Sequence, residues 1–184
     1  MYNTDLMLSI LKRWLPFAFI STVLCALIYL SVQQDLRQSA NDPQIQIAED
    51  AVSDLKKGQT PANLVSSLKQ IEMEESLAPF LIFYDESNKP VESSASLNGR
   101  IPSPPVGVFE FVKLKQSKRF TWEPKKGVRE AAVMIKSSQG FVLSAKSLRE
   151  IEKRDYQLRL QVGIAWIICL LSSLTVSSRD KFNG

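Results

Sequence analysis

The chain has 184 residues, a formal net charge of +4, two cysteines and no histidine. Ser-His-Asp and Cys-His catalysis both need an imidazole, and zinc or copper sites built on His and Cys would lack ligands here. The seven glycines are scattered and form no phosphate-binding loop. We therefore predict a protein that is not an enzyme, with no catalytic residue, no metal site and no cofactor.

The first predicted element is a membrane-spanning helix at residues 15–32. Its sequence, LPFAFISTVLCALIYLSV, holds 18 residues without a charge. At about 1.5 Å per residue such a helix reaches roughly 27 Å, close to the hydrocarbon thickness of a bilayer. The run is longer than the apolar region of a signal peptide, so we expect an anchor that is not cleaved.

Two helices are predicted after this span. Asp42 followed by Pro43 resembles a helix N-cap with proline in the first turn, so we expect the span to end and a new helix to begin there. An apolar stripe at 3-4-3 spacing follows, which consists of Ile45, Ala48, Val52 and Leu55. The stripe either pairs two copies of the chain or packs against the chain's own sheet, and two heptads do not decide between these uses. A second helix is predicted over residues 60–75, opened by Thr60 and Pro61.

From residue 79 onward the pattern changes to short strands separated by turns. The predicted strands are PFLIFYD, PVESSA, KRFTWEP, VREAAVMIKS and GFVLSAKS, at residues 79–85, 90–95, 118–124, 128–137 and 140–147. The acidic stretch ESNK is predicted as the first turn, and residues 108–116 as a short helix or irregular crossover. This order favours a five-stranded antiparallel sheet in the α+β class. Because the first strand is apolar throughout, we expect both of its faces to be covered.

The last predicted element is a helix that runs into a second membrane span. Ser147 and Glu150 form a capping box at its start. We expect this helix to continue without a break into LQVGIAWIICLLSSLTVSS at residues 160–178, which has 19 residues without a charge. The second span is predicted over residues 158–178.

The charges beside the two spans predict their orientation. Basic residues lie just before the first span and just after the second, namely Lys12, Arg13, Arg179 and Lys181. By the positive-inside rule we predict a cell-membrane protein with cytoplasmic segments at 1–14 and 179–184 and an extracytoplasmic domain at 33–157. That domain holds 18 Lys and Arg against 17 Asp and Glu, so it lacks the basic excess of a nucleic-acid binder. The expected partner of the spans is the lipid bilayer.

The order of elements and the hairpin FLIFYDESNKPVESS, at residues 80–94, resemble the single-Cache or PAS-like extracytoplasmic sensor domains of bacterial two-pass membrane sensor proteins. In those proteins a juxtamembrane helix leads into a strand, an acidic turn and a second strand, and the resemblance is close over residues 79–146. It implies a long N-terminal helix, a PAS/Cache-like domain and signal transduction. Such sensors continue into a cytoplasmic output domain, whereas only RDKFNG follows the second span here, so the output is expected through a separate partner.

Three residues are predicted to form a binding site for a small carboxylate. Alternation in the fourth strand places Arg129, Ala131, Val133 and Ile135 on the face expected to meet the core. A guanidinium from Arg129 beside the aromatic rings of Tyr84 and Trp122 would hold a carboxylate through two hydrogen bonds. The alternative is that Arg129 reaches water, Trp122 is an ordinary core residue and Tyr84 donates to a backbone carbonyl.

Two functional hypotheses follow from these predictions. In the first, the outer domain is a sensor-like module that binds a small ligand or a partner protein and signals through a separate membrane or signalling partner. In the second, the chain is a non-sensing accessory or assembly subunit of a membrane complex. The apolar stripe adds a homodimer to the partners of either hypothesis.

Overall fold

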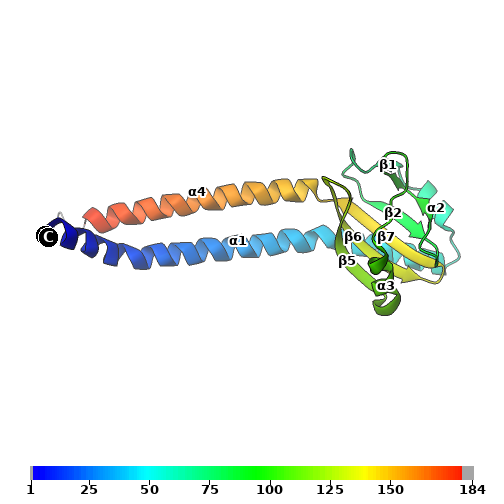
Figure 1. Ribbon diagram of the computed structural model, residues 1–184, viewed down its shortest axis with the longest axis horizontal. Coiled ribbons are helices and arrows are strands. Elements are labelled where there is room, and N and C mark those ends of the chain that lie inside the picture. Colours follow the sequence, from blue (N-terminus) through cyan, green and yellow to red (C-terminus); the bar gives the residue numbers. More distant parts are fainter. Residues whose placement is uncertain (1, 180–184) are drawn as a thin grey trace. The chain divides into compact units, whose positions relative to one another are not determined.

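The structure is a computed structural model that describes residues 2–179, and it has the α+β class (Figure 1). Residues 37–152 form one compact unit, and the segments before and after them form a second. The predicted cytoplasmic tail lies outside the described residues from position 180 onward. In chain order the elements are α1 (Tyr2–Lys56), α2 (Pro61–Ser66), β1 (Ile71–Glu72), β2 (Phe80–Tyr84), β3 (Pro90–Ser93), β4 (Ala95–Ser96), α3 (Val106–Lys115), β5 (Ser117–Lys125), β6 (Val128–Ser137), β7 (Gly140–Ser147) and α4 (Arg149–Arg179).

Five strands form one antiparallel sheet in the order β3-β2-β7-β6-β5, which confirms the predicted sheet. β7 lies at its centre, and β3 and β5 are its edges. A separate parallel ladder of two residues joins β1 to β4, where Ile71 pairs with Ala95 and Glu72 with Ser96. The crossover between β4 and β5 is the regular helix α3.

The acidic stretch after β2 forms the predicted turn. The backbone N–H of Asp85 donates to the Lys89 carbonyl at 2.9 Å, and the Lys89 N–H donates to the Asp85 carboxylate at 2.8 Å. Asn88 has a left-handed φ of 65°, which asparagine tolerates better than most residues. The carboxylate of Asp85 therefore has a structural role in closing the hairpin.

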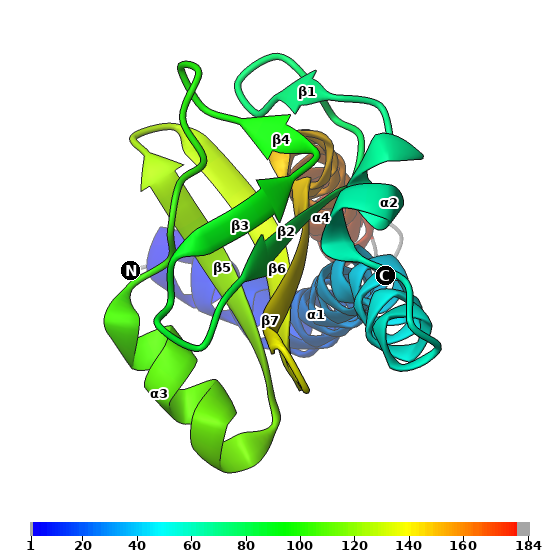
Figure 2. The ribbon, with the colours of Figure 1, turned by 90° about the vertical axis from the view of Figure 1, so that its right-hand side faces the viewer.

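Both faces of the sheet are covered, and all five residues of β2 are buried. On one face the C-terminal part of α1 packs against β2 and β7. This cluster contains Ala51, Val52, Leu55, Val65, Leu81, Phe83 and Val142. Figure 2 shows this part of α1 and α3 on opposite sides of β7. The apolar β2 is thus explained by burial on two faces rather than one.

The apolar stripe of α1 lies largely in the core of its own domain. Ala48, Val52 and Leu55 are buried, whereas Ile45 is half-buried. Packing against the chain's own sheet was one of the two predicted uses of the stripe. Pairing of two copies stays a prediction, and it would have Ile45 as its accessible member.

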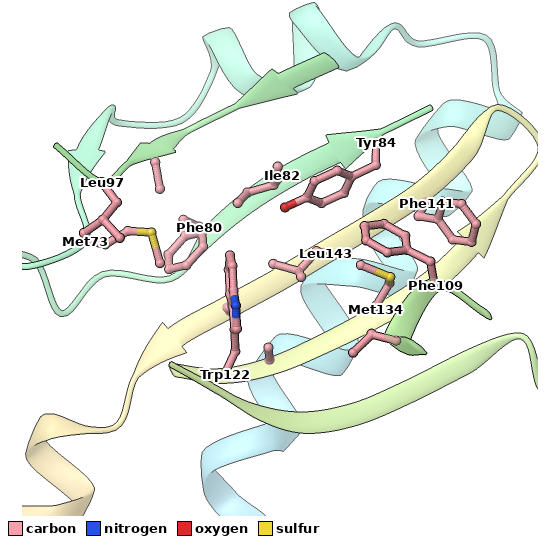
Figure 3. Packing of buried hydrophobic residues seen from close by; sticks show 14 of the residues in the cluster. Met73, Phe80, Ile82, Tyr84, Leu97, Phe109, Trp122, Met134, Phe141 and Leu143 are labelled. Carbon is pink, nitrogen blue, oxygen red and sulfur yellow. The ribbon is translucent and has the colours of Figure 1, made fainter. Parts of the chain in front are cut away.

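The opposite face of the sheet carries the larger core, which α3 covers with Val108, Phe109 and Val112. The ring of Phe109 stands edge-on to the rings of Tyr84 and Phe141, with centroids 5.2 and 5.3 Å away. Figure 3 shows these three rings at one end of the core and Phe80, Met73 and Trp122 at the other. Edge-to-face packing of this kind stabilises aromatic clusters beyond the area they bury.

The predicted helix break at Asp42 and Pro43 is wrong, because α1 runs without interruption from Tyr2 to Lys56. A proline inside a helix removes one backbone donor and can bend the helix. The remaining hydrogen bonds continue on both sides of the proline, and packing of the following turns against the sheet stabilises them.

The second helix is shorter than predicted and ends at Ser66 instead of near residue 75. Its start is as expected, since the Thr60 hydroxyl accepts the Asn63 backbone N–H at 3.3 Å. The acidic residues that follow are not simply solvated. The Glu72 carboxylate accepts hydrogen bonds from the Ser96 hydroxyl at 2.9 Å and the Asn98 N–H at 2.8 Å.

α4 is one continuous helix from Arg149 to Arg179, which confirms that the last predicted helix continues unbroken through the second apolar run. The Ser147 hydroxyl accepts the Arg149 N–H at 3.4 Å, one residue earlier than a capping box would use. The short backbone path from Ser147 to Arg149 means that β7, the central strand, leads directly into this helix.

Two helical segments, Met7–Leu36 of α1 and Arg149–Ser178 of α4, are long and apolar enough to cross a membrane. The parts of α1 and α4 outside the domain lie side by side (Figure 1). The indole N–H of Trp14 donates to the Ser173 hydroxyl at 3.0 Å, and that of Trp166 donates to the Thr22 hydroxyl at 2.9 Å. Such contacts satisfy polar groups within a helix pair, as an apolar environment requires.

Candidate functional site

The structure does not bring the three predicted site residues together. Trp122 and Tyr84 belong to the same core cluster, but they lie at opposite ends of it (Figure 3). In the sheet register Tyr84 of β2 pairs with Phe141 of β7. Trp122 of β5 pairs with Glu130 of β6, which in turn pairs with Ser147 of β7. Six residues of strand correspond to about 20 Å. Tyr84 and Trp122 therefore enter the core at well separated positions along the sheet.

Arg129 lies on the other face of β6. The predicted orientation of β6 was wrong. Val128, Ala132 and Met134 pack in the aromatic core, and Arg129 alternates to the opposite face. The Arg129 guanidinium instead forms an ion pair with Glu152 in the first turns of α4. Since the sheet is covered on both faces, the two sides of β6 differ too little in polarity to reveal which one meets the aromatic cluster.

Tyr84 is buried, and its hydroxyl donates to the Pro102 carbonyl at 2.7 Å. Burial raises the pKa of the Tyr84 hydroxyl, although a hydrogen bond with Ser103 opposes this rise. The side chain thus matches the alternative prediction, in which Tyr84 donates to a backbone carbonyl. Its geometry gives it a structural role in holding the loop before α3.

Replacing Tyr84 by phenylalanine should destabilise the domain by about 1 kcal/mol, because the Pro102 carbonyl loses its donor while the aromatic packing is kept. Chemical denaturation of the full-length protein followed by circular dichroism measures this change. Tyr156, an exposed tyrosine of α4, provides the control in Tyr156→Phe, which should have no measurable effect. Equal stability of Tyr84→Phe and wild type would contradict the assigned hydrogen bond.

The residue that sequence reasoning missed is Glu130, the immediate neighbour of Arg129. In the sheet register Glu130 lies directly opposite Trp122 on β5 and Ser147 on β7. Residues directly opposite each other project from the same face, so the carboxyl group enters the end of the core that holds Trp122. The side chain is only 1% exposed, and neither carboxylate oxygen has a hydrogen-bond partner among the residues that the structure describes.

The environment of Glu130 disfavours its charged form. Burial raises the pKa of Glu130 to about 8, and the positive charge of Arg149 opposes this rise only in part. A carboxyl group in this state is neutral at pH 7 and below. Buried carboxyl groups with such strongly raised pKa values occur preferentially at functional sites.

A small network of charges joins this end of the sheet to α4. Arg149, the first residue of α4, is exposed, and its guanidinium donates to the backbone carbonyl of Glu74 in the segment between β1 and β2. The Glu74 carboxylate in turn forms an ion pair with Lys125 at the end of β5. We define the Glu130 site as Glu130, Trp122, Ser147, Arg149 and Glu74.

A hollow of about 340 Å³ between α1 and α4 is a second place where a ligand could lie. Its lining is mainly small or apolar and includes Ala26, Gly163 and Trp166. The one charged residue in the lining, Arg159, pairs with Asp155 at 3.1 Å on its own helix. The Glu130 site is therefore the stronger candidate, because it holds a buried ionisable group without a partner.

Comparison with known proteins finds no family model, no curated protein and no solved structure that matches this chain. The resemblance to Cache and PAS-like domains thus stays a prediction, and the assignment of a functional site rests on geometry.

The carboxyl group of Glu130 can bind or release a proton. No group of three or more His, Cys, Asp or Glu side chains suited to a metal ion occurs within the described part of the chain. A single acidic residue in the apolar alternation of β6 is the one sequence signal that could have pointed to Glu130. Its burial depends on the strand register, which the sequence pattern does not show.

Proposed function

We propose that this protein is a two-pass membrane protein whose outer domain is a sensor-like module that signals through α4. The observation that carries this proposal is the connection of α4 to the domain. α4 follows directly from the central strand β7, and its first turns are bound by Arg129 of β6 and by the Glu74 carbonyl. A change in the sheet that alters these contacts is transmitted to a helix that continues unbroken to Arg179.

In this proposal the helical segments cross the cell membrane, the termini lie in the cytoplasm and the domain lies outside. The support is the length and apolar composition of the two segments together with the basic residues beside them. A PAS/Cache-like architecture is consistent with the five-stranded antiparallel sheet between two long helices. The output then passes to a separate membrane or signalling partner.

The exposed face of α3 favours the second hypothesis, an accessory or assembly subunit. α3 exposes Val106, Phe111 and Leu114, and Leu114 is 81% exposed. Exposed apolar side chains that lie close together are found at protein-docking surfaces, and these three residues of α3 are the support for this hypothesis. In this case the outer domain would bind another membrane protein without responding to a ligand.

The two cysteines of the chain allow a direct test of transmission through α4. Cys25 lies on α1 and Cys169 on α4, and both are free thiols. A thermal-melt screen of the full-length protein in nanodiscs first identifies a ligand, and a ligand at 100 times its dissociation constant should stabilise the domain by about 2.7 kcal/mol. Spin labels on Cys25 and Cys169 should then report a change in distance when the ligand is added.

Insertion of two glycines after Arg154 should abolish this distance change while leaving ligand binding intact, because glycines interrupt the helix between domain and membrane. The same insertion after Gln59, in the loop between α1 and α2, is the matched control. If the distance change persists with the Arg154 insertion, α4 does not transmit the signal. A blank screen together with a co-purified membrane protein would favour the accessory subunit.

A further inference from the structure

The Glu130 site has an acidic residue that is only 1% exposed and a cation, Arg149, whose positive charge acts on it. We propose that the ligand of this site is a proton. In one state of the domain Glu130 holds the proton, and in the other the ionised Glu130 carboxylate pairs with the Arg149 guanidinium. This inference rests on the proposed function, since it names the stimulus that the sensor-like domain would detect.

The charged groups around the Glu130 site come from α4, from the segment between β1 and β2, and from β5. α4 contributes Arg149, whose positive charge acts on the Glu130 carboxyl. The segment between β1 and β2 contributes Glu74, and β5 contributes Lys125, but these two residues pair with each other. β7 contributes the uncharged hydroxyl of Ser147, which lies opposite Glu130. Arg149 is thus the cation available to stabilise an ionised Glu130.

In the protonated state Glu130 is neutral, and its burial against Trp122 carries no charge into the core. Arg149 is then bound to the Glu74 carbonyl, which is the arrangement in the structure. The absence of a partner on either Glu130 oxygen among the described residues fits this neutral form, because burial of an isolated carboxylate is strongly unfavourable.

When the proton leaves to solvent, Glu130 becomes an anion in an apolar environment. Pairing with the Arg149 guanidinium, whose positive charge already acts on Glu130, would offset this cost. In the proposed second state the guanidinium turns from the Glu74 carbonyl to Glu130, so the segment between β1 and β2 loses its contact with the start of α4. Because Arg149 is the first residue of α4, deprotonation changes the attachment of the helix that leads to the second apolar segment.

Other ligand classes fit these residues less well than a proton. A metal ion or an organic cation would be repelled by Arg149, and the described residues hold no acidic or thiol cluster that could bind a metal. A larger anion would have to reach a carboxyl group that the surrounding chain covers almost completely. A proton needs no cavity, and Arg149 is exposed at the surface, where exchange with water is possible.

Infrared difference spectroscopy of the full-length protein in nanodiscs, titrated from pH 6 to pH 10, tests the proposal. The carbonyl band of a neutral carboxyl group should disappear with a midpoint near pH 8 in the wild type, and this change should be absent from Glu130→Gln. Glu110→Gln, the same exchange on the exposed surface of α3, is the matched control and should retain the wild-type transition. Arg149→Gln should move the midpoint upward by on the order of one pH unit, because the anion loses its cation.

The distance between spin labels on Cys25 and Cys169, measured at pH 6 and pH 10, separates this inference from the proposed function. The proposal predicts a change in wild type and none in Glu130→Gln. A pH-dependent distance that persists in Glu130→Gln would overturn the role of Glu130 while leaving the sensor function intact. An infrared transition that depends on Glu130 but produces no change in distance would support proton binding and count against transmission through α4. If Glu130→Gln does not fold, an unchanged midpoint in Arg149→Gln would overturn the proposed exchange of partners.

Discussion

Replacing Glu130 by glutamine is expected to stabilise the domain by about 2–4 kcal/mol at pH 8 and to have almost no effect at pH 4. Glutamine has nearly the same shape as the neutral glutamic acid, but it never carries the charge that burial disfavours. A gain in stability from altering a buried side chain would be unusual for a residue with only a structural role. It would be expected for a group kept in an unfavourable environment for a function.

The pH dependence follows from the direction of the pKa shift. Burial raises the pKa of Glu130 in the folded protein to about 8, whereas the unfolded chain has a value near 4.5. Below pH 4 both states hold the proton, so the wild type has its full stability. As the pH rises from about 4.5 to 8, the unfolded chain releases the proton and the folded protein keeps it, so the wild type loses stability across this range. The glutamine variant has no proton to release at this position and should not show this loss.

Urea denaturation of the full-length protein in detergent micelles, followed by circular dichroism at pH 4, 6, 8 and 9, measures the effect. The difference between Glu130→Gln and wild type should grow between pH 4 and pH 8 and then level off. Glu110→Gln should follow the wild-type curve at every pH, because Glu110 is exposed. Parallel curves for Glu130→Gln and wild type would show that Glu130 ionises normally in the folded protein.

Replacing Gly140 by alanine is expected to destabilise the domain by on the order of 3–5 kcal/mol. Gly140 begins β7 with a φ of +131°, a conformation that side chains rarely adopt. An added Cβ would lie 2.1 Å from the Tyr84 carbonyl oxygen and within 3 Å of two backbone atoms of Asp85. Because all three neighbours are backbone, the clash cannot be relieved by a change of rotamer, and β7 would have to move away from β2.

Gly127→Ala is the matched control, since it separates backbone strain from the clash. Gly127 also has a positive φ of +86°, but nothing lies within 4 Å of an added Cβ. Its replacement should cost only about 1 kcal/mol. The midpoints and slopes of urea denaturation for the two variants measure the difference. Equal losses of stability would mean that β2 and β7 do not approach each other as closely at Gly140 as the structure indicates.

The two variants address different parts of the proposed mechanism. Gly140 fixes the hairpin of β6 and β7 against the end of β2, and this hairpin carries Glu130 at its other end. In the proposed mechanism, a rigid attachment of this kind is what lets a change at Glu130 reach α4 instead of being absorbed by movement of the strands. The loss of Gly140 should therefore weaken the domain as a whole, whereas the loss of the Glu130 charge should alter its response to pH.

Local sequence patterns predicted most of the secondary structure. The uncharged runs predicted two helices long enough to cross a membrane, and the alternation of short apolar strands with turns predicted the five-stranded antiparallel sheet. The turn after Tyr84 was predicted over ESNK, and in the structure Asp85 and Asn88 close it through a side-chain hydrogen bond and a left-handed backbone that act within four residues. These features depend on neighbours in the chain, so a single sequence carries them. The helix break at Pro43 was wrong because packing of the following turns overrides a local signal.

The arrangement of the candidate site depends instead on contacts between residues far apart in the chain. Arg129 and Glu130 are adjacent, and only the face that β6 turns toward Trp122 decides which of them is buried. That face is selected by α1 on one side of the sheet and α3 on the other, and each side offers an apolar surface. A shift of one residue in the pairing of β5 with β6 would exchange the two side chains. The burial of Glu130 is therefore a property of the assembled sheet, since the free energy that selects the register comes from packing both layers at once.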